Sequence, residues 1–309
     1  MNDQNKSRSD ELPTTEHAKA RAFQFSIKKT LLLILIIAIT ASGWLYIRES
    51  TRQADRRQIL DQPQENIEEA DQTDDTHPLD PVLKIAYQSI KQMEENLVDY
   101  TAVLSRRERV GEQEMPPSSM EVKIRNPRND QAFSIYVKFI KPENTKGREV
   151  IWVDGQNDNK IVAHEAGLLG LLKVVQPPDS FIAMVGNRYP VTETGLLRLM
   201  RKLTQYGLRD RKHGDCSVEI IENITVAEVN CTRLRIVHPE KQEPFTFHIA
   251  EIDMDMERMI PIRLATWDWP LAQQEPPLVE EYIYHKLRLN AGLKDLDFDP
   301  ENPAYNYPD

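Results

Sequence analysis

The sequence predicts an α+β protein built on one large curled antiparallel sheet, a half-open barrel of about 10 strands with helices packed on or across it. Three observations predict this class. Short runs rich in β-branched and aromatic residues recur between residues 98 and 290, with Pro, Gly, Asn and Asp between them. Two segments with helical periodicity stand before and amid these runs. An apolar stretch precedes the folded part and predicts one transmembrane helix.

That stretch, residues 31–47, holds 17 residues without a charge. We expect residues 1–29 to be a disordered cytoplasmic tail and residues 30–47 to be a transmembrane signal anchor. A cleaved signal peptide is the alternative, because Ala41-Ser42-Gly43 resembles a cleavage site. Lys and Arg are equally frequent on the two flanks, so the orientation rests on the usual outcome for a single early span.

The next segment, residues 48–79, is expected to be an acidic flexible linker. Eight acidic residues and no Lys or Arg lie between Asp61 and Asp80, which is typical of a solvated spacer. One extracytoplasmic domain is expected over residues 80–300, because strand and turn signals alternate without a second linker. Residues 301–309 are expected to form a C-terminal tail.

The elements of this domain follow from local patterns. A first helix is expected to begin with Asp80 as its N-cap and Pro81 at its first position. Strands are expected at residues 98–110, 118–126, 132–141, 148–155, 160–167, 216–221, 225–238, 245–254, 260–267 and 280–290. Because the connections between them are short, consecutive strands should pair antiparallel.

The central helix follows the loop Gly186-Asn187-Arg188-Tyr189-Pro190. Thr192 or Thr194 could cap it, and Gly207 is placed to end it. Its apolar stripe is Leu196, Leu199, Met200, Leu203 and Tyr206. We expect this stripe to lie across the mouth of the curled sheet and to face its interior. Gly186 suits a turn with positive φ. Arg188 is expected at the rim, in a structural salt bridge rather than at an anion site.

The two cysteines, Cys216 and Cys231, are a disulfide candidate in an exported domain. A hairpin that turns between Asn223 and Ile224 would place them opposite each other. A turn at residues 227–230 would put them out of register.

Several kinds of chemistry are not expected. The net charge of -10 argues against a nucleic-acid partner. No His pair has metal-ligand spacing, and Asp253-x-Asp255-x-Glu257 lacks the glycine and distal Glu of a calcium loop. His213, Asp215 and Cys216 are neighbours in sequence, which does not make a spatial dyad. We therefore expect no catalytic residue, metal or cofactor. Trp267 and Trp269 could form the lip of a cavity, although ordinary packing is the commoner role for such a pair.

Several quoted stretches resemble a bacterial family catalogued as domain of unknown function 1571. They are YTAVLSRRERV, YVKFIKPENTKGREVIWVDGQND, GNRYPVTETGLLRLM, KHGDC, ATWDWP, EEYIYHKLRLNAGL and DFDPENPAY. The resemblance covers roughly residues 80–305. That family is in turn similar to the periplasmic lipoprotein carriers of the LolA and LolB type. This similarity implies a half-open antiparallel barrel that holds acyl chains in an apolar cavity, and it transfers no individual site residue.

These observations predict a membrane-anchored envelope protein that is not an enzyme. It would bind an apolar ligand, either a lipid or a lipidated protein, in the cavity of the curled sheet. A protein-interaction or sensor module with a packed core is the alternative, and a hydrolase is a more distant one. The expected location is the inner membrane, with a single span and the large domain extracytoplasmic. Export after signal cleavage is the alternative location, and the oligomeric state is left open.

Overall fold

The computed structural model describes residues 68, 76–165, 172–271 and 274–308. They belong to one compact unit, Leu60–Asp309. The expected cytoplasmic tail, the expected anchor at residues 30–47 and nearly all of the expected linker lie outside the described residues. Within the described part of the chain, no helix is long and apolar enough to cross a membrane.

A single antiparallel sheet dominates the unit. Its 12 strands are β1 (Asp99–Val110), β2 (Gln113–Glu114), β3 (Ser118–Arg125), β4 (Ser134–Lys141), β5 (Glu149–Val153), β6 (Ile161–His164), β7 (Lys173–Gln176), β8 (Ser217–Val226), β9 (Val229–Val237), β10 (Ile249–Asp255), β11 (Ile260–Trp267) and β12 (Leu278–Leu289). The spatial order is β7-β6-β5-β4-β3-β1-β12-β11-β10-β9-β8, and β2 pairs with β1. Because β7 and β8 end this order, the described sheet is not closed. The predicted α+β class with a large antiparallel sheet is confirmed.

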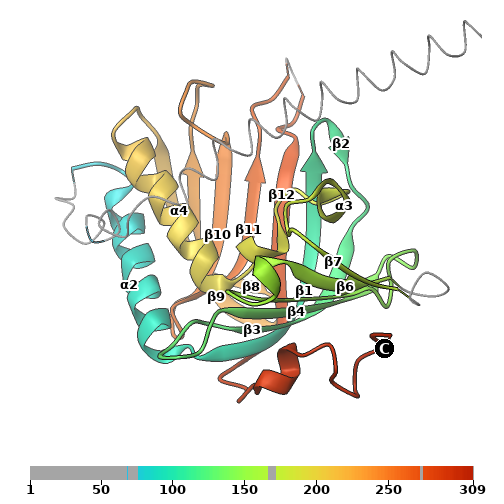
Figure 1. Cartoon of the computed structure of the whole chain (residues 1–309). Helices are drawn as coiled ribbons and strands as arrows, with labels where there is room; N and C mark the ends of the chain where they lie inside the picture. The colour runs from blue at the N-terminus through green and yellow to red at the C-terminus, as the bar shows by residue number, and fades with distance from the viewer. Residues whose placement is uncertain (1–67, 69–75, 166–171, 272–273, 309) are drawn as a thin grey trace, which may run out of the picture. The chain divides into compact units, whose positions relative to one another are not determined.

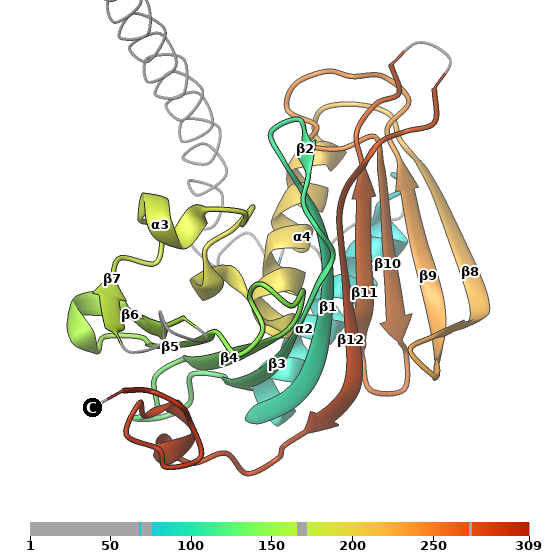
Figure 2. The ribbon, with the colours of Figure 1, turned by 90° about the vertical axis from the view of Figure 1, so that its right-hand side faces the viewer.

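The sheet bends at its middle, where β1 pairs with β12. Figures 1 and 2 show β8 to β12 standing as one arm and β3 to β7 turning away as a second arm. We call the face that carries Leu104, Met120 and Leu264 the inner face, and the face that carries Ser105, Arg263 and Glu281 the outer face. Residue alternation along each strand separates these two sets.

Two helices, α2 (Asp80–Asn96) and α4 (Leu196–Arg211), pack side by side against the inner face. The buried apolar side chains of α2 are Leu83, Ala86, Ile90, Met93 and Val82. The helix begins one residue earlier than expected, since Leu79 is the N-cap and Asp80 is already helical. Asp80 accepts a hydrogen bond from the His77 amide and pairs with Arg211 at 2.6 Å, so it ties the start of α2 to the end of α4.

The ends of α4 correct two expectations. Gly195, with φ of 143°, is the N-cap in place of a threonine, and the Leu196 amide donates to the Tyr100 hydroxyl at 2.9 Å. Gly207 does not end the helix, which continues to Arg211. A Cβ at Gly207 would lie 2.9 Å from Leu83, so the glycine serves the close approach of α2.

Among the elements that sequence patterns missed are the short strands β2 and β7 and the short helix α3 (Phe181–Met184). The segment predicted as one strand from residue 225 is split by the turn of the β8–β9 hairpin, where Val226 pairs with Val229. That turn puts the cysteines out of register: Cys231 faces Ile224, while Cys216 precedes the other end of β8. Both are free cysteines, so the predicted disulfide is wrong.

The C-terminal segment packs on the outer face of the second arm. At the end of the 3-10 helix Asp295–Phe298, the Phe298 side chain joins a cluster with Tyr136, Ile151 and Val153. Tyr305 stacks on Tyr136 with ring centroids 4.2 Å apart. Residues of the expected C-terminal tail therefore contribute to the packing of the sheet.

Candidate functional site

A cavity of about 360 Å³ lies between the inner face and the segments that cover it. The sheet contributes apolar side chains from both arms, among them Leu104, Met120, Val137, Phe139, Val150, Ile161, Ala163 and Leu264. Helix α4 and the segment of residues 177–194, which we call the strap, line the opposite wall. The lining comes from both arms of the bent sheet, and Figure 2 shows the angle between these arms.

The stripe predicted on α4 divides between two environments. Leu199, Leu203 and Tyr206 line the cavity. Met200 borders a smaller pocket of about 50 Å³ that lies between α4, α2 and the arm formed by β8 to β12. Leu203 and Tyr206 line this smaller pocket as well. Leu196 is fully buried at the start of the helix, beside Tyr100. The stripe thus faces the interior of the curled sheet, and part of it meets open space there.

Buried charged side chains fasten the strap to the sheet at one end of the cavity. The Nε atom of Arg188 lies 3.1 Å from Glu280 Oε2, and its Nη1 donates to the Arg109 carbonyl oxygen at 3.0 Å. The Arg188 amide donates to Glu108, which also accepts a 2.5 Å hydrogen bond from the Tyr282 hydroxyl. Arg188 is only 9% exposed. The expected salt bridge is present, but the expected position at the rim is wrong, because Arg188 lies in the wall.

A second pair of charges extends this cluster along the strap. Lys202 on α4 pairs with Glu193 at 2.9 Å and lies 3.7 Å from the centre of the Tyr189 ring. Burial, together with Glu108 and Glu280, holds the pKa of the Tyr282 hydroxyl well above its usual range. Although burial opposes its charge, the pKa of Lys202 is raised by Tyr189, Tyr206 and Glu193. The Tyr282 hydroxyl and the Lys202 ammonium therefore keep their protons at neutral pH, which suits a clamp better than proton transfer.

Part of the exposed lining of the cavity is apolar. Ile182 and Val185, at and just after α3, line the cavity and are yet 70% and 60% exposed. Gly186 follows with φ of 71°, as its position in the loop predicts. Sequence reasoning missed this region, since α3 is a single turn and β7 is a short edge strand. The signal that could have found it is the run Phe181-Ile182-Ala183-Met184-Val185, which has no polar residue.

The smaller pocket holds a buried acid and a buried imidazole. Asp210 Oδ2 lies 3.6 Å from His238 Nε2, and the two residues are 2% and 1% exposed. Burial raises the pKa of Asp210 to about 6 and lowers the pKa of His238 to about 4. Arg209 also pairs with Asp210 at 2.6 Å.

The structure does not support Cys216 as an activated nucleophile. Burial raises the pKa of the Cys216 thiol to about 11, the opposite of an activated nucleophile. His213 Nδ1 lies 2.7 Å from the Arg209 carbonyl oxygen at the end of α4. No group of three or more His, Cys, Asp or Glu side chains within the described ranges is placed to hold a metal ion.

Ion pairs and a turn account for Asp253 and Asp255, the acidic residues of β10 that were considered as part of a calcium loop. Asp253 pairs with Arg233 at 2.7 Å and with Arg263 at 3.2 Å. Asp255 accepts hydrogen bonds from the amides of Glu257 and Arg258 in the turn that follows.

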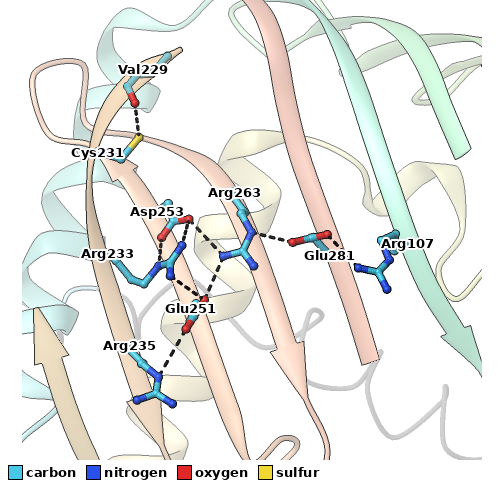
Figure 3. A network of polar contacts seen from close by, with 9 residues as sticks. All are labelled: Arg107, Val229, Cys231, Arg233, Arg235, Glu251, Asp253, Arg263 and Glu281. Atoms are coloured by element: carbon cyan, nitrogen blue, oxygen red, sulfur yellow. Dashed lines mark hydrogen bonds and ion pairs between the residues drawn. The ribbon is translucent and has the colours of Figure 1, made fainter. Parts of the chain in front are cut away.

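Asp253 belongs to a network that crosses the outer face from β9 to β1 (Figure 3). Its charged members are Arg235, Arg233, Glu251, Asp253, Arg263, Glu281 and Arg107. Arginines and carboxylates alternate from strand to strand, so each charge has a neighbour of opposite sign within the sheet itself.

The two tryptophans do not form a lip. Trp269 is 9% exposed, and its Nε1 donates to the His238 carbonyl oxygen at 3.1 Å. The centre of the Trp267 ring lies 5.9 Å from the guanidinium of Arg263, which the outer face carries. Neither lines the cavity, and ordinary packing accounts for both.

The chain belongs to the family described as "Protein of unknown function (DUF1571)", whose sequence model matches residues 97–307. The family assignment made from the quoted motifs is confirmed. No curated protein matches the chain.

Solved structures offer only distant likenesses. A DUF1329 family protein from Desulfovibrio piger ATCC 29098 is 12% identical, with a TM-score of 0.38, over 72% of this chain and 98% of that one. A putative outer membrane lipoprotein-sorting protein domain from Vibrio parahaemolyticus is 9% identical, with a TM-score of 0.33, over 69% and 97%. The MucA/MucB complex of Pseudomonas aeruginosa is 13% identical, with a TM-score of 0.39, over 69% and 60%. These likenesses are too weak to support an argument about function. A functional conclusion therefore has to start from the cavity.

Proposed function

We propose that this member of the DUF1571 family is a non-enzymatic binding protein that holds an apolar ligand, a lipid or the acyl chain of a lipidated protein. The observation that carries the proposal is the cavity of about 360 Å³ on the inner face of the bent sheet. Its volume falls in the range of about 300–1,000 Å³ that is usual for small-molecule sites.

The chemistry of the walls favours an apolar ligand. Aliphatic and aromatic side chains of β1, β3, β4, β5, β6 and α4 line most of the cavity. The charged groups at its end already pair with one another, as Arg188 does with Glu280 and Lys202 does with Glu193. A polar substrate would have to compete with these internal contacts, whereas an acyl chain needs only apolar surface.

A protein-interaction module with a filled core is supported less well. Such a module needs a packed interior, and here Leu199, Leu203 and Tyr206 border open space instead. Ligand analysis separates the two functions, because a filled core retains no extractable lipid.

The expected location is retained as part of the proposal. Residues 30–47 would anchor the chain in the inner membrane, and residues 48–79 would link the anchor to one extracytoplasmic domain over residues 80–300. A reporter fused to the C-terminus should be active in the envelope and remain with the membrane fraction. Activity in the cytoplasm would reverse the orientation, and release as a soluble protein would favour cleavage of the signal.

The direct test is lipid extraction and mass spectrometry on natively purified protein. The informative variant is Leu199→Trp, which places a larger side chain in the cavity and should lower bound lipid several-fold. Its matched control is Leu271→Trp, the same substitution at a side chain that is 72% exposed and does not line the cavity. A wild-type protein that carries no apolar ligand, or equal lipid in both variants, would overturn the proposal.

A further inference from the structure

Exposed apolar side chains gather in one part of the described chain. Over all the described residues, ten large hydrophobic side chains are exposed, and six of these ten fall within residues 172–185. These six, which we call the apolar rim, are Leu172, Val174, Val175, Phe181, Ile182 and Val185. Water-exposed aliphatic and aromatic groups are common singly, but a cluster marks a surface that is covered in use.

The rim is held in its exposed position by hydrogen bonds. The Ser180 hydroxyl caps α3 by accepting from the Ala183 amide at 3.3 Å. The Asn187 side chain donates to the Ala183 carbonyl oxygen at 2.8 Å, and it accepts from Arg106 at 2.8 Å. Arg188 then fastens the next residue of the strap to the sheet. Exposure of Phe181 and Ile182 is therefore built into the fold rather than left to a loose loop.

The rim also borders the cavity. Ile182 and Val185 line it, whereas Phe181 is not among the lining residues. A ligand that enters or leaves past this mouth would keep its apolar surface in contact with apolar side chains if the rim were itself embedded in an apolar phase.

We propose that the apolar rim docks the domain onto the interfacial region of a lipid bilayer, with the mouth of the cavity turned toward the acyl chains. Within residues 172–185 the only charged side chains are Lys173 and Asp179, and an interfacial segment of this kind binds through buried apolar area. The net charge of -10 opposes attraction to anionic lipids, so docking depends on insertion of these side chains.

The chain outside the described residues permits this contact. This step rests on the proposed anchor at residues 30–47. Residues 48–75 separate that anchor from the described domain, and at about 3.3–3.6 Å per residue they could span at most roughly 100 Å. That reach exceeds the roughly 30 Å diameter of a small domain, so the rim can turn toward the membrane to which the chain is tethered.

The test uses the full chain in phosphatidylcholine vesicles. Phe181→Cys is labelled with an NBD fluorophore in a Cys216→Ser background, and lipids brominated on their acyl chains serve as quenchers. Leu271→Cys is the matched control, an exposed apolar position outside the rim. A chain without the added cysteine measures background labelling. We expect blue-shifted emission at residue 181 and quenching at least about two-fold greater than at residue 271, with little salt dependence.

Two outcomes would overturn the proposal. Emission and quenching at residue 181 that match residue 271 would show that the rim stays in water. Blue-shifted emission without quenching by brominated lipid would show that a protein surface, such as a second copy of the chain, covers the rim. Adding Leu199→Trp separates the rim from the cavity: quenching at residue 181 should persist in that variant even when bound lipid is lost.

Discussion

On the inner face of the sheet, apolar side chains are covered by α2, α4 and the strap, and the charges among them are almost fully buried. On the outer face between β9 and β1, arginines and carboxylates alternate from strand to strand (Figure 3), and the side chains at the two ends of this row, Arg107 and Arg235, are open to solvent. Arg188 on the inner side is 9% exposed, whereas the Arg107 side chain on the outer side is 46% exposed. The same kind of ion pair therefore stands in two different dielectric surroundings.

The contrast teaches where the stability and the function of this fold reside. Solvent screens the pairs at the two ends of the outer network, those of Arg107 and Arg235, so each of these contributes little. On the inner side, a charge that loses its partner cannot recover water, so each pair matters. The cavity lies on the covered face, and the proposed binding is assigned to that face. Four predictions test this division, from the largest expected effect to the smallest.

Arg188→Ala is expected to lower the free energy of unfolding by about 3–5 kcal/mol, because Glu280 would stay buried without its cation. Urea denaturation measures the change. The matched outer variant Arg107→Ala should cost less than about 1 kcal/mol. Comparable losses in the two variants would remove the distinction between the faces.

The Asp210–His238 pair predicts opposite pH dependences in its two single variants. Asp210→Asn leaves His238, whose pKa is lowered to about 4. Because this pKa lies below that of the unfolded chain, stability should be lost as the pH falls from about 6.5 to about 4. His238→Gln leaves Asp210, whose pKa is raised to about 6. Its stability should be lost as the pH rises from about 4 to about 6.

Each of these losses should approach about 3 kcal/mol, by proton linkage. In the wild type the two pH-dependent changes in stability nearly cancel. Near pH 5, Asp210 and His238 together bind about one proton in the folded state and about one in the unfolded state. Unfolding by urea at several pH values measures all three slopes. A wild-type slope as steep as that of either variant over this window would contradict the assignment.

Leu203→Ala should cost about 1–2 kcal/mol, near or below the lower end for buried leucines. Its side chain borders both the cavity and the smaller pocket, so truncation removes fewer contacts than in a packed core. Leu208→Ala, at a leucine of α4 that is 5% exposed and lines neither space, is the control and should cost about 2–5 kcal/mol. Thermal and urea unfolding compare the two, and an equal loss would indicate that no open space adjoins Leu203.

The smallest effects are expected on the outer face. Arg235→Ala should change stability by less than about 0.5 kcal/mol, because its contacts to Glu251 and Glu219 are long, at 3.4 and 3.7 Å, and partly exposed. Arg263→Ala should cost more, since Arg263 is 12% exposed and pairs with Glu281 at 2.8 Å. Added salt should shrink the effect of Arg235→Ala first.

Much of the fold could be predicted from local sequence signals. Alternation identified most strands, and periodicity identified α2 and α4, because both signals depend on which face of an element is buried. The ends of elements depended on contacts that the sequence does not display. Gly207 looks like a helix stop, but it lies inside α4 because Leu83 packs against it. A hairpin register likewise depends on which residues accept the turn, and here Ala227 and Glu228 adopt positive φ.

The candidate site was only partly foreseeable. The stripe from Leu196 to Tyr206 follows from helical spacing, and its orientation toward the interior follows from the need to bury it. The partners of Arg188 come from β1 and β12, which lie far apart in the sequence and side by side in the sheet. No local pattern brings Glu108 and Glu280 together, so burial of Arg188 could not be predicted.

The pairing of β1 with β12 places the first and last strands of the domain at the centre of the sheet. All the other strands are made between them, so neither arm can be joined to the other until the chain is nearly complete. Such a long-range contact makes folding slow, because loop closure precedes the contacts that reward it. Until then the edges of β1 and β11 are unpaired and open to other chains. Loss of residues after 277 would therefore leave two unjoined arms rather than a smaller version of the same protein.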